Sequence, residues 1–153
     1  MNTDKKGGTT MDETRVAEIS PAEWEVMRIV WTKGGAYSRE LIDMLQAKRD
    51  WSASTVKTLL RRLVNKGMLE TTREDRRFKY DATITESTAM NSTAEQLFDN
   101  LCAMKRGKTL LDLVENTTLS QSDIAALQVK LAEKAKSAPE TIQCDCLPED
   151  CEC

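Results

Sequence analysis

The stretch SASTVKTLLRRLVNKGMLETTREDRRFKYDATI, residues 52–84, changes its hydrophobic period partway along its length. Its first half places apolar residues at helical spacing after a serine that suits a helix N-cap, which predicts a helix over residues 53–66. After Gly67 the pattern alternates between apolar and polar residues, which predicts a β-hairpin that turns near Glu74 and Asp75. The segment therefore predicts a helix followed directly by a two-stranded ribbon.

Two further helices are predicted upstream. In ISPAEWEVMRIVW, residues 19–31, a Ser-Pro start and a glutamate three residues after the serine predict a capped helix that ends near Lys33. After a Gly-Gly turn, Ser38 is expected to cap a second helix that ends at about Lys48. The apolar side of this second helix is expected to consist of Leu41, Ile42, Met44 and Leu45.

Three helices and a ribbon over residues 19–84 are typical of a winged helix-turn-helix DNA-binding domain, in which one helix enters the major groove. We expect lysines and arginines to contact phosphates and hydroxyl groups near the helix start to read bases. Two alternatives stay open, because a winged helix can also bind proteins and the threonines can simply face solvent. The expected DNA-contacting residues are Ser54, Thr55, Lys57, Thr58, Arg61, Arg62, Arg76, Arg77 and Lys79.

The charge of the chain is unevenly distributed. The 153 residues carry a net charge of -3, but residues 57–79 hold eight bases and three acids, and residues 137–153 hold five acids and no base. A basic region in an acidic chain favours one face for polyanions, although a solvated surface is the simpler alternative. The chain has no histidine, the commonest catalytic base, so we expect a protein that is not an enzyme.

Residues 85–137 have apolar residues at spacings of three, four and seven, and Ser120 with Asp123 predicts the cap of the last helix. Helices this short do not bury an apolar face alone, so we expect a helical dimerisation region, with packing against the first domain as the alternative. Cys102 is expected to be a small buried apolar side chain and not a metal ligand. The polar residues 1–18 predict a flexible arm.

The last segment, residues 138–153, ends in CDCLPEDCEC. Its cysteines, Cys144, Cys146, Cys151 and Cys153, supply four thiolates, enough for a closed tetrahedral zinc site, and soft thiolates also suit Cu(I). A disulfide or redox tail is the alternative. No apolar run is long enough to cross a bilayer and no secretory signal is recognisable, so we expect a cytoplasmic protein without a membrane partner.

The runs ISPAEWEVMRIVW, STVKTLLRRLVNKG and RRFKY resemble the winged-helix repressors of the penicillinase-repressor type, and the tail pattern CxCxxxxCxC resembles their CopY-type copper-responsive branch. The resemblance implies a mainly α protein with a small β-ribbon. It also implies a zinc-loaded homodimer on a palindromic operator, released when Cu(I) displaces Zn(II) from the tail, so that copper-export genes are derepressed. A copper chaperone that donates Cu(I) is a further expected partner.

The sequence departs from this family pattern in two places. Glu74, Asp75 and Arg76 stand at the ribbon turn, where the family often has glycine. The chain also lacks the Asn-Phe dipeptide at which the β-lactam-responsive branch is cleaved, and has Asn100-Leu101 and Phe98-Asp99 instead, which favours release by a ligand. The competing function is a cytosolic copper-buffering or copper-delivery protein with a protein-binding winged domain.

Overall fold

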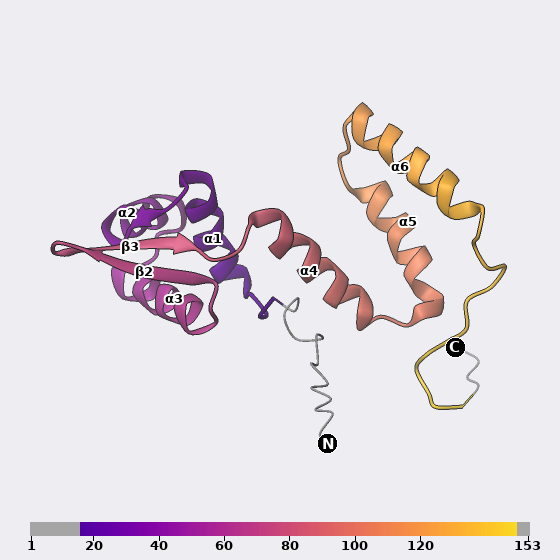
Figure 1. Cartoon of the computed structure of the whole chain (residues 1–153), viewed down its shortest axis with the longest axis horizontal. Helices are drawn as coiled ribbons and strands as arrows, with labels where there is room; N and C mark the ends of the chain where they lie inside the picture. The colour runs from indigo at the N-terminus through magenta and orange to yellow at the C-terminus, as the bar shows by residue number, and fades with distance from the viewer. Residues whose placement is uncertain (1–15, 150–153) are drawn as a thin grey trace, which may run out of the picture. The chain divides into compact units, whose positions relative to one another are not determined.

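The computed structural model describes residues 16–149, which divide into two compact units with the boundary between Ala94 and Glu95 (Figure 1). The expected mainly α fold with a small β-ribbon is confirmed, and most of the predicted N-terminal arm lies outside the described residues. Within these residues, no helix has the length and apolar content that a bilayer crossing requires. The elements are α1 (Pro21–Lys33), β1 (Ala36–Tyr37), α2 (Ser38–Arg49), α3 (Ala53–Asn65), β2 (Leu69–Glu74), β3 (Arg77–Ala82), α4 (Glu86–Asp99), η1 (Ala103–Lys105), α5 (Arg106–Asn116) and α6 (Gln121–Ala135).

The start of α1 is fixed by the predicted capping box. The Ser20 hydroxyl accepts a hydrogen bond from the Glu23 backbone N–H at 3.2 Å, and the Glu23 carboxylate accepts one from the Ser20 N–H at 3.0 Å. Two backbone N–H groups that lack a helical partner are thereby satisfied. The helix ends at Gly34, whose φ of 69° lies in the left-handed region that glycine adopts readily.

The start of α2 differs from the prediction. Tyr37, not Ser38, is the N-cap, and the Glu40 carboxylate accepts a hydrogen bond from the Tyr37 N–H at 2.9 Å. The chain before this helix also forms the short strand β1, which the sequence analysis missed because two residues are too few to show an alternating pattern. Met44 is 37% exposed, so its predicted place on the buried side is wrong; Leu41, Ile42 and Leu45 alone form that side.

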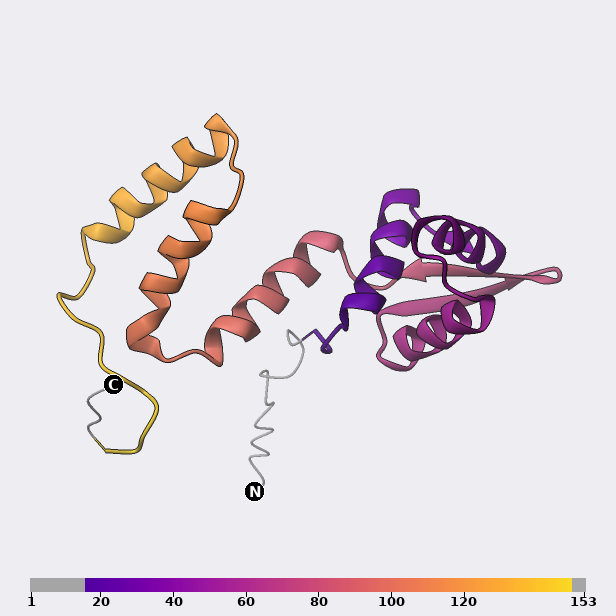
Figure 2. The ribbon, with the colours of Figure 1, turned by 180° about the vertical axis from the view of Figure 1, so that it is seen from behind.

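The sheet is antiparallel, with strand order β1-β3-β2, and Figure 1 shows its long hairpin of β2 and β3. The hairpin of β2 and β3 pairs Leu69 with Ala82 at its base and Glu74 with Arg77 at its tip. Asp75 takes the positive φ of 55° that the tight turn requires, and aspartate tolerates this conformation better than most residues. The hairpin tip extends beyond the helices of its own unit, as the wing of a winged helix does (Figures 1 and 2).

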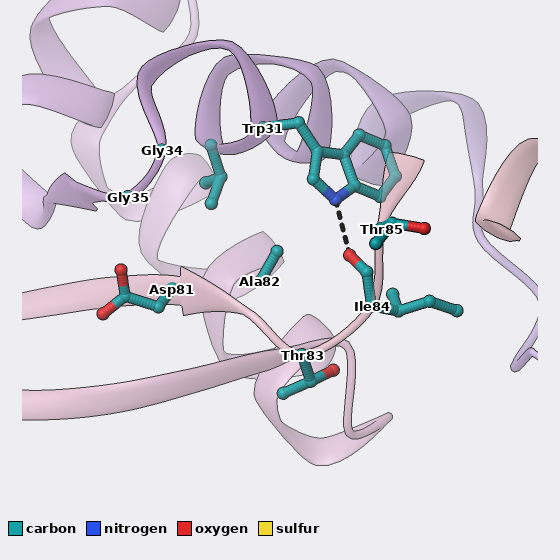
Figure 3. Close-up of a pocket in the computed structure, with 9 residues that line it drawn as sticks. Trp31, Gly34, Gly35, Asp81, Ala82, Thr83, Ile84 and Thr85 are labelled. Carbon is teal, nitrogen blue, oxygen red and sulfur yellow. Dashed lines mark hydrogen bonds between the residues drawn. The ribbon is translucent and has the colours of Figure 1, made fainter. Parts of the chain in front are cut away.

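The base of the hairpin is fastened to α1. The Trp31 indole N–H donates a hydrogen bond to the Ile84 carbonyl at 2.8 Å (Figure 3). Beside it, Gly35 has a φ of 108°, and a Cβ there would collide with the Asp81 carboxylate, so the close approach of loop and strand requires glycine (Figure 3). The buried core behind these contacts comes from α1, α2, α3 and the hairpin. Its largest apolar side chains with less than 2% exposure are Val26, Met27, Val30, Leu41, Leu45, Val56, Leu60 and Leu63.

The second unit contains the end of α4, then η1, α5 and α6, and a tail that returns past the start of α5 (Figures 1 and 2). The predicted cap of α6 is confirmed, since Ser120 accepts a hydrogen bond from the Asp123 N–H at 3.1 Å. None of the described residues of η1, α5 and α6 is fully buried. The apolar faces of these helices therefore lie open within a single chain.

Candidate functional sites

The exposed face of α3 carries the hydroxyl groups that the sequence predicted to read bases. Ser54, Thr55 and Thr58 are all exposed. The Thr58 hydroxyl donates to the Ser54 carbonyl at 2.9 Å, and the Thr55 hydroxyl shares a hydrogen bond with the Ser52 hydroxyl at 2.9 Å. These bonds hold both threonine side chains in place near the helix start while leaving acceptor lone pairs and methyl groups outward.

The bases of α3 lie on the same exposed face. Lys57, Arg61 and Arg62 are exposed. Within residues 16–149, none of them forms a salt bridge, although Arg62 acts electrostatically on Glu23. Among the described residues, one side of this helix therefore presents positive charge that no salt bridge compensates.

Lys66, at the end of α3, has a different surrounding. Its ammonium group lies 2.6 Å from the carboxylate of Glu23, which is only 2% exposed, and 2.6 Å from the Glu18 carbonyl. Burial raises the pKa of Glu23, but the hydrogen bonds from Lys66 and from the Ser20 backbone outweigh it and lower that pKa overall. Lys66 thus neutralises a buried acid and is not part of the open basic face.

The three wing bases that were predicted to contact DNA differ in how they are held. Arg76 is exposed at the turn. Arg77 places its guanidinium over the ring of Tyr37, 4.4 Å from the centroid, and Lys79 is half-buried beside Asp81, with Nζ and carboxylate 3.5 Å apart. The Tyr37 hydroxyl donates to Glu74 on β2. Tyr37 therefore orients the wing. The sequence does not indicate this role, because the residue follows a turn and belongs to no periodic pattern.

Three cysteine sulfurs meet in the second unit. The Sγ atoms of Cys102, Cys144 and Cys146 all lie within 4.8 Å of one another, and those of Cys102 and Cys144 are 3.7 Å apart. The structure holds Cys144 in a disulfide, so a metal site at this position requires the reduced protein. Of the predicted ligands, Cys144 is half-buried and Cys146 is exposed, and Cys151 and Cys153 lie outside the described residues.

The expectation for Cys102 is wrong in one respect. The residue is half-buried, not enclosed among apolar side chains, and its neighbours are sulfurs from the tail. Burial raises the pKa of Cys102, but hydrogen bonds from the Cys146 side chain and from the backbone of Met104 and Lys105 lower it overall. The hydrogen bond between Cys146 and Cys102 raises the pKa of Cys146. The chain brings these sulfurs together across more than forty residues, and no local pattern contains that information.

Asp145 attaches the tail to the loop that carries Cys102. Its carboxylate accepts a hydrogen bond from the Ala103 N–H at 2.8 Å and lies 3.4 Å from the Arg106 guanidinium. The Ala103 hydrogen bond lowers the pKa of Asp145. Arg106 is itself held, because it donates to the carbonyls of Leu101 at 3.0 Å and Asp99 at 3.2 Å. Asp145, which stands between Cys144 and Cys146, is thus fastened by two contacts, one of them to a side chain that is itself held.

Comparison with known proteins identifies a family that shares most of the chain. The sequence profile of the family described as "Penicillinase repressor" matches residues 19–133 of the chain, a range that runs from α1 almost to the end of α6. The match stops before the cysteine-rich tail, so the part shared with the family consists of the winged unit and the helices that follow it.

Individual relatives cover a similar range. An uncharacterized 16.5 kDa protein of Latilactobacillus sakei is 57% identical over 136 residues, which cover 89% of this chain and 93% of that protein. The methicillin resistance regulatory protein MecI of Mammaliicoccus sciuri is 34% identical over 122 residues, or 80% of this chain and 99% of the relative. Among solved structures, the DNA-binding domain of the repressor BlaI is 37% identical, covers 49% of this chain and 92% of that domain, and superposes with a TM-score of 0.46.

Proposed function

The chain belongs to the penicillinase repressor family, whose members are DNA-binding transcriptional repressors and not enzymes, and from this premise we propose that it is a copper-responsive repressor. A zinc-loaded homodimer binds a palindromic operator and leaves it when Cu(I) displaces Zn(II) from the CxCxxxxCxC tail, which derepresses copper-export genes. The observation that carries the metal response is the meeting of three cysteine sulfurs at the tail. This cluster favours a metal ion as the ligand that releases the proposed repressor, in place of the proteolytic release of the β-lactam-responsive branch.

The DNA side of the proposal rests on the open face of α3. In a winged helix, the start of this helix lies in the major groove, and phosphate contacts supply most of the affinity. Lys57, Arg61 and Arg62 are exposed along it, and we assign them and the wing bases Arg76, Arg77 and Lys79 to phosphates. Base reading falls to Ser54, Thr55 and Thr58, whose hydroxyl groups suit base edges.

The dimer rests on the apolar faces of α5 and α6. Eight large apolar side chains on these two helices are between 40% and 67% exposed, more than a stable monomer leaves open over two short helices. A second copy covers such a surface by two-fold symmetry, and that symmetry matches the half-sites of a palindromic operator. The side chains are Leu110, Leu111, Leu113, Val114, Ile124, Leu127, Val129 and Leu131.

The tail supplies the switch through its shape. One Zn(II) or two Cu(I) ions on four thiolates leave the same net charge, so the exchange does not alter repulsion between the tail and DNA. Zn(II) demands a tetrahedron of four ligands, whereas Cu(I) accepts two or three sulfurs and shares bridging thiolates. Metal exchange therefore changes the shape of the tail, and about 1–3 kcal/mol of coupling suffices to release an operator.

The test is selection of bound sequences from a random DNA library by the reduced, zinc-loaded protein, followed by titration of the selected duplex with Cu(I). We expect a palindromic consensus and loss of binding on copper addition. Cys146→Ser should select the same duplex, bind it less tightly and fail to respond to copper, because it removes a metal ligand from the second unit and leaves the winged unit unaltered. Selection of no DNA sequence would favour the copper-buffering alternative, and an unaltered copper response of Cys146→Ser would exclude Cys146 as a ligand.

A further inference from the structure

The tail cysteines do not meet by themselves in this structure, because a sulfur from outside the tail lies among them. Cys102 follows α4 and precedes η1, and its Sγ lies 3.7 Å from that of Cys144. All three sulfurs of the cluster fit within a sphere of metal-site size, with no pair separated by more than 4.8 Å. The cluster belongs to one compact unit, so its geometry does not depend on how the two units are arranged.

The spacing of these sulfurs suits a metal–thiolate site. Four sulfurs bonded tetrahedrally to zinc at about 2.3 Å lie roughly 3.8 Å from one another, close to the 3.7 Å between Cys102 and Cys144. The donor set is also chemically right, since soft d10 cations prefer thiolate sulfur. Lys105 acts electrostatically on this cluster, so a cationic side chain offsets part of the thiolate charge.

The position of Cys102 in the cluster is held by groups other than the sulfurs. Asp145 stands between Cys144 and Cys146 in the chain and is fastened to the Ala103 N–H and to Arg106. Because Ala103 is the neighbour of Cys102 and neither contact of Asp145 involves sulfur, both contacts remain when the Cys144 disulfide is reduced and hold the CxC pair beside Cys102 before any ion binds. A preorganised set of donors loses less conformational freedom on binding than three free cysteines do.

We propose that Cys102 is a ligand of the metal site, and that Cys102, Cys144 and Cys146 together bind one soft thiophilic d10 cation, Zn(II) or Cu(I). This inference rests on the proposed metal-responsive function and adds to it a ligand from the segment between α4 and α5. The consequence is mechanical: a metal held by Cys102 ties the tail to the helical region assigned to dimerisation. A site made by the tail alone has no such connection.

The test follows the alkylation of each cysteine in the reduced full-length protein, kept under nitrogen, with iodoacetamide and mass spectrometry. One sample is metal-free, one contains Zn(II) and one contains Cu(I). We expect at least one of the two metals to slow alkylation of Cys102 by about tenfold or more, in parallel with Cys144 and Cys146, because a coordinated thiolate is not available as a nucleophile. Comparison of the Zn(II) and Cu(I) samples shows which of the two ions Cys102 coordinates.

A pair of variants provides the second measurement. Cys102→Ser should lower the affinity for the ion that protects Cys102 by at least about tenfold in competition with a chromophoric chelator, since loss of even an indirect supporting group weakens metal sites by roughly 10–100-fold. Ala103→Ser places a hydroxyl at the adjacent position, keeps every sulfur and retains the N–H that binds Asp145, so it should match the parent. Circular dichroism verifies that both variants fold.

Two results would overturn the inference, and they differ in what they leave standing. If both metals protect the tail cysteines while Cys102 reacts at its metal-free rate, Cys102 is not a ligand and the proposed repressor function survives with a tail-only site. If neither metal protects any cysteine, the metal-responsive function itself fails. Because the alkylation measurement uses the unaltered chain, it decides the question even if Cys102→Ser does not fold.

Discussion

Individual basic residues of the winged unit have separate tasks, although the sequence presents them as one cluster. Lys66 neutralises the buried Glu23 and so stabilises the start of α1. Arg77 lies against the Tyr37 ring and Lys79 beside Asp81. Arg61 is exposed and, among the described residues, forms no salt bridge. A side chain whose charge is uncompensated gains most from a phosphate, so the strength of each DNA contact should follow this division.

Arg61→Ala tests the division at a single residue. If the guanidinium contacts one phosphate, the variant should bind operator more weakly, and the slope of log affinity against log salt should decrease in magnitude by about one unit. Fluorescence anisotropy at several salt concentrations measures both quantities. Arg28→Ala is the matched control, because Arg28 is also exposed but lies on α1 and interacts with Glu25. An unchanged slope for Arg61→Ala would remove this residue from the interface.

At the scale of elements, α1 and α2 are joined by a charge clamp. The Glu25 carboxylate on α1 lies 2.7 Å from Lys48 and 2.5 Å from Arg49, both in the last turn of α2. The hydrogen bonds from Lys48 and Arg49 lower the pKa of Glu25 to about 2. The two bases also stand where the negative end of the α2 dipole favours them. The clamp therefore holds the last turn of α2 against α1.

The clamp predicts a defined pH dependence. The unfolded chain has the ordinary glutamate pKa near 4.5 and the folded chain has a Glu25 pKa of about 2. Between these values the unfolded state binds more protons, so the stability that the clamp contributes decreases as the pH falls. Glu25→Gln should lower the urea midpoint at neutral pH, and the difference from the parent should shrink as the pH falls from about 4.5 towards 2. A difference that persists unchanged through this range would mean that Glu25 acts by packing and not by charge.

The control for the clamp is Glu70→Gln, at an exposed carboxylate on β2 that forms no salt bridge among the described residues. Its urea midpoint should follow that of the parent through the whole pH range. Circular dichroism as a function of urea concentration measures the unfolding midpoint of the parent, Glu25→Gln and Glu70→Gln. Loss of the clamp should also weaken operator binding slightly, because α2 and α3 then sit less firmly against α1.

Elements whose signals are local were predictable from the sequence. Ser20, Ser52 and Ser120 each start a helix through a side-chain bond to the backbone three residues later, and such caps are encoded in four adjacent residues. Strand β1 was not predictable, because it exists only through pairing with β3 more than forty residues away. The N-cap of α2 was misassigned because Glu40 bonds to the backbone of Tyr37, one residue before the serine that the pattern favoured.

At the scale of the whole molecule, the sequence predicted the two kinds of site but not how one of them is built. The exposed face of α3 follows from helical periodicity alone. The cluster around Cys102 depends on the return of the tail to the loop after α4, which Asp145 and Arg106 secure. Contacts of this kind join residues about forty positions apart, and neither spacing nor composition indicates them. The tail is therefore part of the second unit through a polar anchor as well as through sulfur.

The final prediction separates a tail that supports DNA binding from one that only collects metal. Truncation after Ser137 removes the four thiolates, the Asp145 anchor and a local charge of -5. Loss of the zinc-held shape should weaken operator binding, whereas loss of acidic repulsion should strengthen it. Charges beyond a Debye length of about 8 Å act weakly at physiological salt, and Asp145 is already paired with Arg106. We therefore expect the truncated protein to bind operator less tightly than the zinc form and to ignore copper.

A full-length variant with serine in place of Cys144, Cys146, Cys151 and Cys153 separates the causes, because it keeps the acids and the Asp145 anchor while losing the tail thiolates. It should resemble the truncated protein in operator affinity if metal-held shape is the deciding factor, and exceed it if the anchor contributes on its own. Anisotropy titrations at one salt concentration compare the three proteins. Should both altered proteins bind operator as tightly as the zinc-loaded parent, the tail does not support the bound state, and copper must then act through a contact that forms only in the copper-loaded protein.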